Sequence, residues 1–138
     1  MLIVLFAAGL SAQDPEPDPC KGFSTSDMAA CGEIRIAAAE RELERYKAVV
    51  QKQIDEIDDP QYRADAQADF DNANKLWPDY LEAECGAIVD SWGEATIRVP
   101  VHYGCLISAI EYRTYGLWQN WMRPPEHRPP LLPEPKKP

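Results

Sequence analysis

The sequence predicts an all-α fold, in which an antiparallel helical hairpin and a third helix are stapled by two disulfides at one end. Three observations support this prediction. Apolar residues recur every three or four positions in three separate stretches, which is the period of a helix. The connection between the first two stretches is short, so these helices should lie antiparallel. Four cysteines then map to the same end of the bundle. With 138 residues and 45% hydrophobic content, the chain is expected to form one domain with a modest core.

The first helix is predicted to start near Ser26 and to end at Ile57. Ser24 and Asp27 form a capping-box pattern at its start, because the side chain of each can accept a hydrogen bond from the backbone N–H of the other. Charged residues fill most of the helix surface, and one face is apolar. The residues of that face are Ile36, Ala39, Leu43, Tyr46, Val50 and Ile57.

The second helix is predicted to begin at Pro60, since Asp59 can cap it and proline is favoured at the first helical position. Its apolar face is expected to pack on the first helix as core. The residues of that face are Tyr62, Ala66, Phe70, Ala73, Trp77 and Tyr80. Pro78 removes a backbone donor, so we expect a kink or an early end there. Cys85 should stand at the exit of the helix, with Gly86 as the stop signal.

Residues 86–99 lack a helical period and contain Gly93, so they are predicted to form a loop. Pro100 should open the third helix, which ends near Trp121. Its inward positions are predicted to be Leu106, Ile110, Arg113 and Leu117. The last segment, residues 123–138, holds seven prolines and is expected to be disordered.

The N-terminal residues are typical of an exported protein. Residues 1–12 are apolar and end in small residues, which predicts a signal peptide cleaved after Ala12, although no Lys or Arg precedes the run. This run is too short to span a bilayer, which takes roughly 20 apolar residues. A lead-in rich in proline and acids, residues 13–23, would join it to a helical domain over residues 24–122. The mature protein is therefore expected in the periplasm or outside the cell.

The four cysteines are expected to form disulfides in such an oxidising compartment. We favour the pairs Cys20–Cys31 and Cys85–Cys105, since each would clip a flexible stretch to the helix beside it. The alternative pairs Cys31 with Cys85 and Cys20 with Cys105, because antiparallel helices bring those ends together. A zinc site is not expected, since no Cys-x-x-Cys pair is present and neither His102 nor His127 stands at ligand spacing from a cysteine. No cofactor is predicted either, as no Gly-rich phosphate loop is present.

The chain is strongly acidic, with a formal net charge of -9; residues 123–138 carry +2, so the preceding residues carry -11. This balance argues against nucleic acid, whose phosphates favour clusters of Lys and Arg. Two interpretations are open. The charge attracts a cationic protein partner, or it is only the solvated surface of the helices.

Catalysis has little support in the sequence. His102 has no second histidine, free thiol or serine motif beside it in the pattern. Glu82 and Glu84 do not share a helical face, so they do not suggest the paired carboxylates of a glycosidase. We therefore predict that the protein is not an enzyme.

The motifs of the chain together resemble the LprI-type lysozyme-inhibitor N-terminal domain, over roughly residues 20–117. The matching residues are Ser26, Asp27, Met28, Cys31, Glu40, Leu43, Trp77, Tyr80, Glu84, Cys85, Cys105, Arg113 and Leu117. The resemblance implies an exported, disulfide-bonded helical protein that inhibits lysozyme. The chain departs from the family pattern at three positions. Glu44 stands where Asn is usual, Leu81 stands where Arg is usual, and Pro78 follows the tryptophan directly.

A basic lysozyme would be steered toward an acidic inhibitor by charge. The predicted loop offers residues for insertion into its cleft, with Trp92 as a rigid apolar anchor, Ser91 as a donor and Gly93 beside them. The alternative is that Trp92 folds back over the core. A function of another class is also open, namely an envelope interaction or scaffold domain that holds partners through the acidic hairpin and the proline-rich tail.

Overall fold

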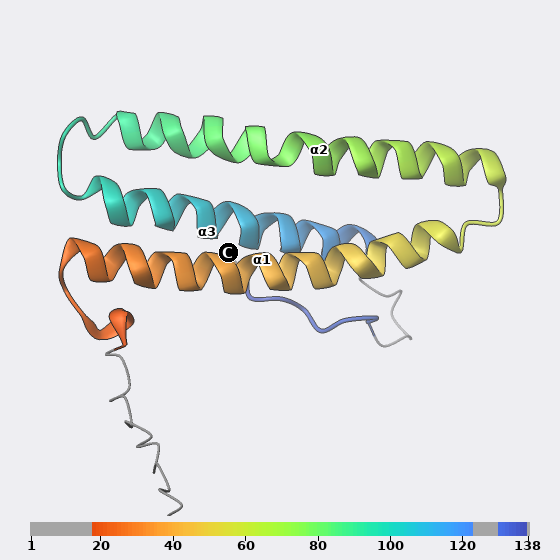
Figure 1. The fold of residues 1–138 in the computed structure, drawn as a ribbon. Coiled ribbons are helices and arrows are strands. Elements are labelled where there is room, and N and C mark those ends of the chain that lie inside the picture. Colours follow the sequence, from red (N-terminus) through yellow and green to blue (C-terminus); the bar gives the residue numbers. More distant parts are fainter. Residues whose placement is uncertain (1–17, 123–129, 138) are drawn as a thin grey trace, which may run out of the picture.

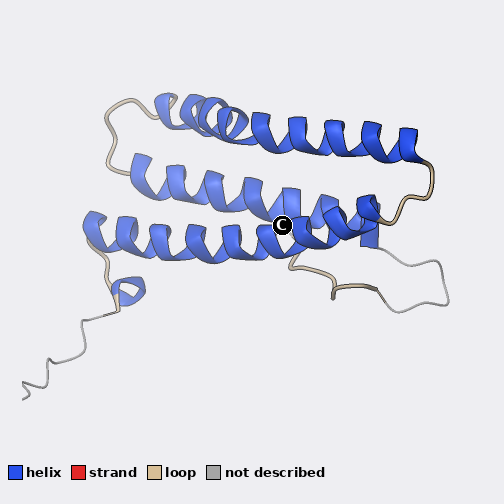
Figure 2. Cartoon of the chain, turned by 45° about the vertical axis from the view of Figure 1, so that its right-hand side comes forward, coloured by secondary structure: helices blue, strands red, loops and turns tan. Residues whose placement is uncertain are grey.

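The computed structural model describes residues 18–122 and 130–137, and within these residues the protein consists of helices and connecting segments with no strand. Three long helices lie side by side; the second runs back along the first, and the third runs parallel to the first (Figures 1 and 2). They are α1 (Thr25–Asp55), α2 (Pro60–Asp90) and α3 (Arg98–Leu117). A 3₁₀ turn, Pro19–Lys21, precedes α1, and a π-helical turn, Trp118–Met122, follows α3. The all-α prediction is confirmed. The predicted signal peptide, residues 1–12, lies outside the described residues.

The caps predicted at the starts of α1 and α2 are present. The Ser24 hydroxyl accepts from the N–H of Asp27 at 3.0 Å, and the Asp27 carboxylate accepts from the N–H of Ser24 at 3.1 Å. Hydrogen bonds from the hydroxyl and the N–H of Ser24 lower the pKa of Asp27. Asp59 accepts from the N–H groups of Gln61 and Tyr62 at 2.8 and 3.1 Å. These local rules place both helix starts within a residue of the prediction.

The end of α2 differs from the prediction. The helix continues through Pro78 and past Gly86 to Asp90, so an early end at either residue is wrong. Pro78 leaves only one backbone carbonyl without its helical donor, and Ala87, Ile88 and Val89 carry the helix for a further turn. The connection to α3 is therefore shorter than the expected loop over residues 86–99. It comprises residues 91–97.

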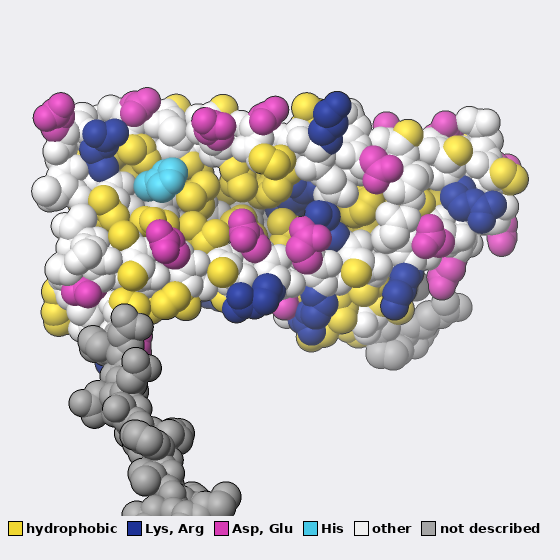
Figure 3. Space-filling view, in the orientation of Figure 1, with side chains coloured by type: hydrophobic (Ala, Val, Ile, Leu, Met, Phe, Trp, Pro, Cys, Tyr) yellow, Lys and Arg dark blue, Asp and Glu magenta, His cyan; other side chains and the backbone are white. Residues whose placement is uncertain are grey.

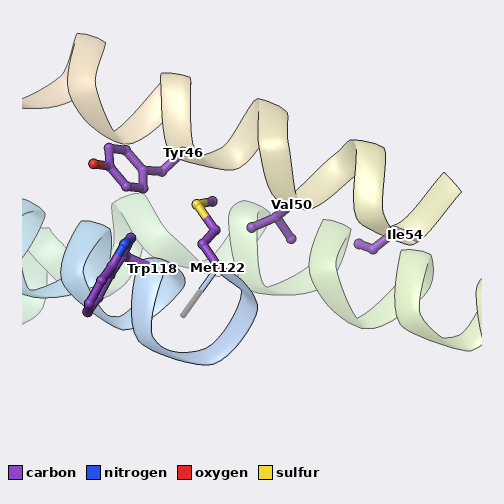
Figure 4. Close-up of a cluster of buried hydrophobic side chains, with 5 residues drawn as sticks. All are labelled: Tyr46, Val50, Ile54, Trp118 and Met122. Carbon is purple, nitrogen blue, oxygen red and sulfur yellow. The ribbon is translucent and has the colours of Figure 1, made fainter. Parts of the chain in front are cut away.

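The largest buried cluster lies between α1 and the chain that follows α3. Tyr46, Val50 and Ile54 of α1 point toward Trp118 and Met122 of the π-helical turn (Figure 4). Leu43 of α1 and Ile107 and Ile110 of α3 extend the buried surface toward the other end. Near the start of α1, a Cβ added to Gly32 would clash with the ring of Tyr103 on α3, so glycine permits the close approach of these helices there.

The apolar face of α2 does not form the expected core against α1. Cys85 is the only fully buried residue of α2, and Tyr80 is 52% exposed. Only the beginning of α2 packs beside α1, where Ala66 and Phe70 touch the core cluster and Gln51 and Gln67 exchange hydrogen bonds at 2.5 and 3.1 Å. The reason is composition. α2 has only two β-branched residues, Ile88 and Val89, both near its end. In α3 there are five such residues to fill a helix interface: Val99, Val101, Ile107, Ile110 and Thr114.

The C-terminal residues also differ from the prediction. Disorder was expected over residues 123–138, but residues 130–137 are packed against the body of the protein. Leu132 lies against the core cluster, and its carbonyl accepts from the Trp118 indole N–H at 3.2 Å. Prolines exclude helix and sheet, but they also restrict the free chain, so docking costs less conformational entropy than their number suggested. Residues 123–129 lie outside the described residues.

The largest buried cluster, formed by Tyr46, Val50, Ile54, Trp118 and Met122, yields a stability prediction. Replacing the fully buried Ile54 by alanine is expected to lower the free energy of unfolding by about 2–5 kcal/mol, through lost transfer energy and a cavity. Urea unfolding followed by circular dichroism measures it. The matched control is Ile34→Ala on the same helix, where the side chain is 53% exposed and the expected effect is within about 0.5 kcal/mol. Equal losses for the two variants would contradict this location of the core.

Candidate partner-binding surface

Both disulfides lie toward the end of the bundle that carries the connection between α2 and α3. Cys20 pairs with Cys31, with a Cα–Cα distance of 4.8 Å, and Cys85 pairs with Cys105, with a Cα–Cα distance of 5.6 Å. These are the favoured pairs, and the alternative pairing is excluded. One bridge ties the N-terminal turn to α1, and the other ties α2 to α3. The connection of residues 91–97 therefore leaves and re-enters helices that are covalently joined.

The connection itself is a sequence of tight turns. The N–H of Trp92 donates to the carbonyl of Val89, and the N–H of Gly93 donates to that of Asp90, both at 3.1 Å. Gly93 has a φ of 57°, a left-handed conformation that glycine adopts without strain. Across the base of the connection, Arg98 and Asp90 form an ion pair at 3.7 Å. Backbone hydrogen bonds within the turn and the ion pair at its base thus hold the turn residues in place.

The three residues singled out in this connection have different surroundings. Trp92 is 47% exposed, so its ring is neither fully solvated nor covered by the core. The Ser91 hydroxyl donates to the carbonyl of Ile88 at 2.6 Å and so serves the end of α2. Gly93 shapes the turn. Trp92 and Ile97 are therefore the residues of the connection that present exposed large apolar side chains.

A hollow of about 590 Å³ adjoins this connection. It is lined by the first turns of α1, the end of α2, the connection and the start of α3, through Thr25, Ala29, Val89, Ala95, Thr96, Arg98, Val99, His102 and Tyr103. Figure 3 shows hydrophobic side chains gathered between α2 and the other two helices toward this end, with acidic side chains around them. The hollow exists because α2 packs against α3 rather than against the first half of α1.

A second groove, of about 740 Å³, follows the seam between α2 and α3. Its walls include Phe70, Trp77, Tyr80 and Glu84 from α2 and Ser108, Ala109, Tyr112, Arg113 and Leu117 from α3. The rings of Trp77 and Tyr80 stack with centroids 5.6 Å apart. The sequence pattern placed these rings correctly on one face, but it assigned them to the core, so the groove was missed. Periodicity gave no signal for the groove, because it reports which residues share a face and not what covers that face.

Arg113 holds the two walls of this groove together. Its guanidinium lies 4.4 Å from the centroid of the Trp77 ring and donates to the side-chain oxygen of Asn74 at 2.6 Å. Burial lowers the pKa of Arg113, while the nearby carboxylate of Glu44 raises it. Glu44 is one of the departures from the family pattern. Here it places a negative charge close to the half-buried Arg113.

The residues considered for catalysis are not brought together. His102 stands beside Tyr103 at the start of α3, with ring centroids 5.7 Å apart, and Glu82 and Glu84 are exposed on α2. Within residues 18–122 and 130–137, no group of three or more His, Cys, Asp or Glu side chains could hold a metal ion. None of the described helices is long and apolar enough to cross a membrane.

The Cys85–Cys105 bridge should contribute substantially to stability. Replacing both cysteines by alanine is expected to lower the free energy of unfolding by roughly 3 kcal/mol, because the bridge closes a loop with a sequence separation of 20 residues. Denaturant unfolding measures the loss. As a companion test, thiol titration of denatured, unreduced protein should find no free thiol, since all four cysteines are paired. Two reactive thiols would show that one bridge is absent in solution.

Comparison with known proteins gives one match. A family model described as lysozyme inhibitor LprI matches residues 20–117, which include both disulfides, the three helices and the connection between α2 and α3. No curated protein and no solved structure matched the chain. Since the model covers well over half of the chain, the protein belongs to the lysozyme inhibitor LprI family.

Proposed function

We propose that this protein is exported, binds a basic lysozyme and blocks its cleft with the connection between α2 and α3. The observation that carries the proposal is the half-exposed Trp92 on a short, braced turn between two disulfide-linked helices. An aromatic anchor on a preorganised segment loses little conformational entropy on binding. Membership of a lysozyme inhibitor family supports the choice of partner.

The charge of the protein supports the same partner. The formal net charge is -9, and Trp92 stands between Asp90, the last residue of α2, and Glu94 of the connection. Lysozymes that are strongly basic would be attracted from a distance and oriented toward this acidic end. Once they meet, Trp92 and Ile97 present exposed apolar surface that can be buried in the cleft. Long-range charge and short-range apolar contact would thus act at the same place.

Export fits the same proposal. We propose that residues 1–12 act as a signal peptide and that residues 13–23 are a lead-in to the helical domain over residues 24–122. Two disulfides support a periplasmic or extracellular location, because such bonds persist in oxidising compartments. No catalytic step is assigned to the protein; it would act by occupying the active site of another protein.

The groove between α2 and α3 favours a second candidate function, a non-enzymatic scaffold in the cell envelope. Tyr80, Ile88 and Tyr112 are all exposed along it, and a partner that fills the groove would bury them. This function needs no lysozyme. A turnover assay with purified oxidised protein and lysozymes of several classes separates the two candidates, because the scaffold leaves lysozyme activity unchanged.

The inhibitor proposal predicts a specific effect of Trp92→Ala. A buried aromatic anchor typically carries about 2 kcal/mol or more, so inhibition should weaken roughly thirtyfold. The loss should appear mainly as faster dissociation in surface plasmon resonance. Tyr62→Ala is the matched control, since Tyr62 is a 69% exposed aromatic residue near the opposite end of α2. If Trp92→Ala lowers the melting temperature and leaves affinity intact, the ring serves the fold and the connection is not the anchor.

The proposal also predicts a strong dependence on salt. The association rate constant is expected to fall steeply as ionic strength passes about 0.15 M, where the Debye length is about 8 Å. Stopped-flow measurements over a salt series test this, with Trp92→Ala as the control that should keep the same slope. A rate that does not respond to salt would remove charge steering from the proposal. No inhibition of any lysozyme class would favour the scaffold.

A further inference from the structure

Residues 130–137 occupy a groove along α1 and α3 that the functions above do not use. The segment leads back from the end of α3 in the direction opposite to both helices (Figure 1). Leu132 and Pro133 lie beside Tyr46 and Trp118, and Pro135 and Lys136 line a cavity with residues nearer the middle of α1 and α3. The segment lies outside the residues matched by the family model.

The contacts follow the chemistry by which proline-rich peptides are recognised. Two aromatic donors bind two successive carbonyls, since the Tyr46 hydroxyl donates to Pro133 at 2.5 Å and the Trp118 indole N–H donates to Leu132 at 3.2 Å. A segment rich in proline has few N–H groups, so its carbonyls and its apolar side chains carry most of the recognition. Burial raises the pKa of Tyr46 above its ordinary value.

Side-chain contacts add selectivity at two further positions. The Leu132 side chain packs against the cluster that contains Tyr46, Trp118 and Met122. At the other end, the Lys136 ammonium lies 3.6 Å from the Glu111 carboxylate. Beside it, a cavity of about 340 Å³ is lined by Arg35, Ala38, Ala39, Glu42, Ile107, Glu111, Thr114, Pro135 and Lys136. The groove thus provides an apolar site, two donors and an acidic end, in that order along the segment.

We propose that this groove is a binding site for proline-rich peptides of the form Leu-Pro-x-Pro-Lys, and that the chain's own residues 130–137 are its exchangeable ligand. Covalent attachment gives the segment an effective concentration on the order of millimolar. A peptide with the same features on a second copy or another protein competes only when this segment is displaced. The groove is then a regulated site that is closed by default.

The test separates the ligand from the groove by cutting the chain. A specific protease site is introduced between Met122 and Pro130 of the full chain, and the purified protein is cleaved after folding. The synthetic peptide Pro-Leu-Leu-Pro-Glu-Pro-Lys-Lys is then titrated into the cleaved body after removal of the released segment, with tryptophan fluorescence and calorimetry as readouts. We expect the body to keep its helical circular dichroism and to bind the peptide saturably, whereas the uncut protein binds it at least tenfold more weakly.

Matched variants decide which contacts carry the binding. Tyr46→Phe keeps the ring and removes the donor to Pro133, so affinity should fall about fivefold to tenfold, the usual effect of one neutral hydrogen bond. A peptide with alanine at the positions of Pro133 and Pro135 should bind more weakly. A glutamate at the position of Lys136 should weaken binding in a salt-dependent way, because it meets Glu111.

Several outcomes would overturn the proposal. If the body unfolds on removal of the segment, residues 130–137 are a part of the core and not a ligand. If the folded body does not bind the peptide, the groove is not a peptide site. If cut and uncut proteins bind equally well, the peptide binds elsewhere. These results are independent of lysozyme inhibition, which is measured with the Trp92→Ala variant on the uncut chain.

Discussion

The architecture depends on the apolar seam between α1 and α3, two parallel helices that are not neighbours in the sequence. Tyr46, Val50 and Ile54 are completely buried on the α1 side. Ile110 of α3 and Trp118 of the π-helical turn that follows it are buried on the other side. Burial of such side chains is worth about 1.5–3 kcal/mol each, which far exceeds what capping or exposed ion pairs contribute. α2 connects the two helices but adds little buried surface of its own. The Cys85–Cys105 bridge attaches its second half where packing is weakest.

The open surfaces follow from this unequal packing. If α2 packed on both α1 and α3 along its whole length, it would cover the hollow beside Val89 and bury the rings of Trp77 and Tyr80. Because α2 rests on α3 alone in its second half, it leaves a hollow on one side and a groove lined by these rings. Arg113 shows how the arrangement is stabilised without an apolar core. It joins α3 to α2 through a cation–π contact and one hydrogen bond, at the cost of partial desolvation.

The features that could be predicted from the sequence are those that local interactions determine. The caps at Ser24 and Asp59 need only neighbouring N–H groups, and the disulfide pairs join segments that are close along the chain. Three features could not be predicted. The partner of α1 depends on which distant apolar face fits it, and periodicity reports only that a face exists. α2 continues past Gly86 because Ala87, Ile88 and Val89 extend it and the Cys85–Cys105 disulfide holds it against α3. The docking of Leu132 depends on a core cluster most of whose members are distant from it in the sequence.

The surfaces proposed at the α2–α3 connection and at the α1–α3 groove use different physical forces, so experiments can separate them. The action proposed for the α2–α3 connection, in which Trp92 stands between Asp90 and Glu94 and would meet a cationic partner, would depend on charge and salt. The α1–α3 groove selects its ligand by two aromatic donors and an apolar site, with a single ion pair at one end. Its ligand also covers part of the main core cluster. Displacement of residues 130–137 therefore uncovers part of the core and lowers the stability of the fold. To offset this loss, the displacing peptide must supply an equivalent leucine and the same carbonyl acceptors.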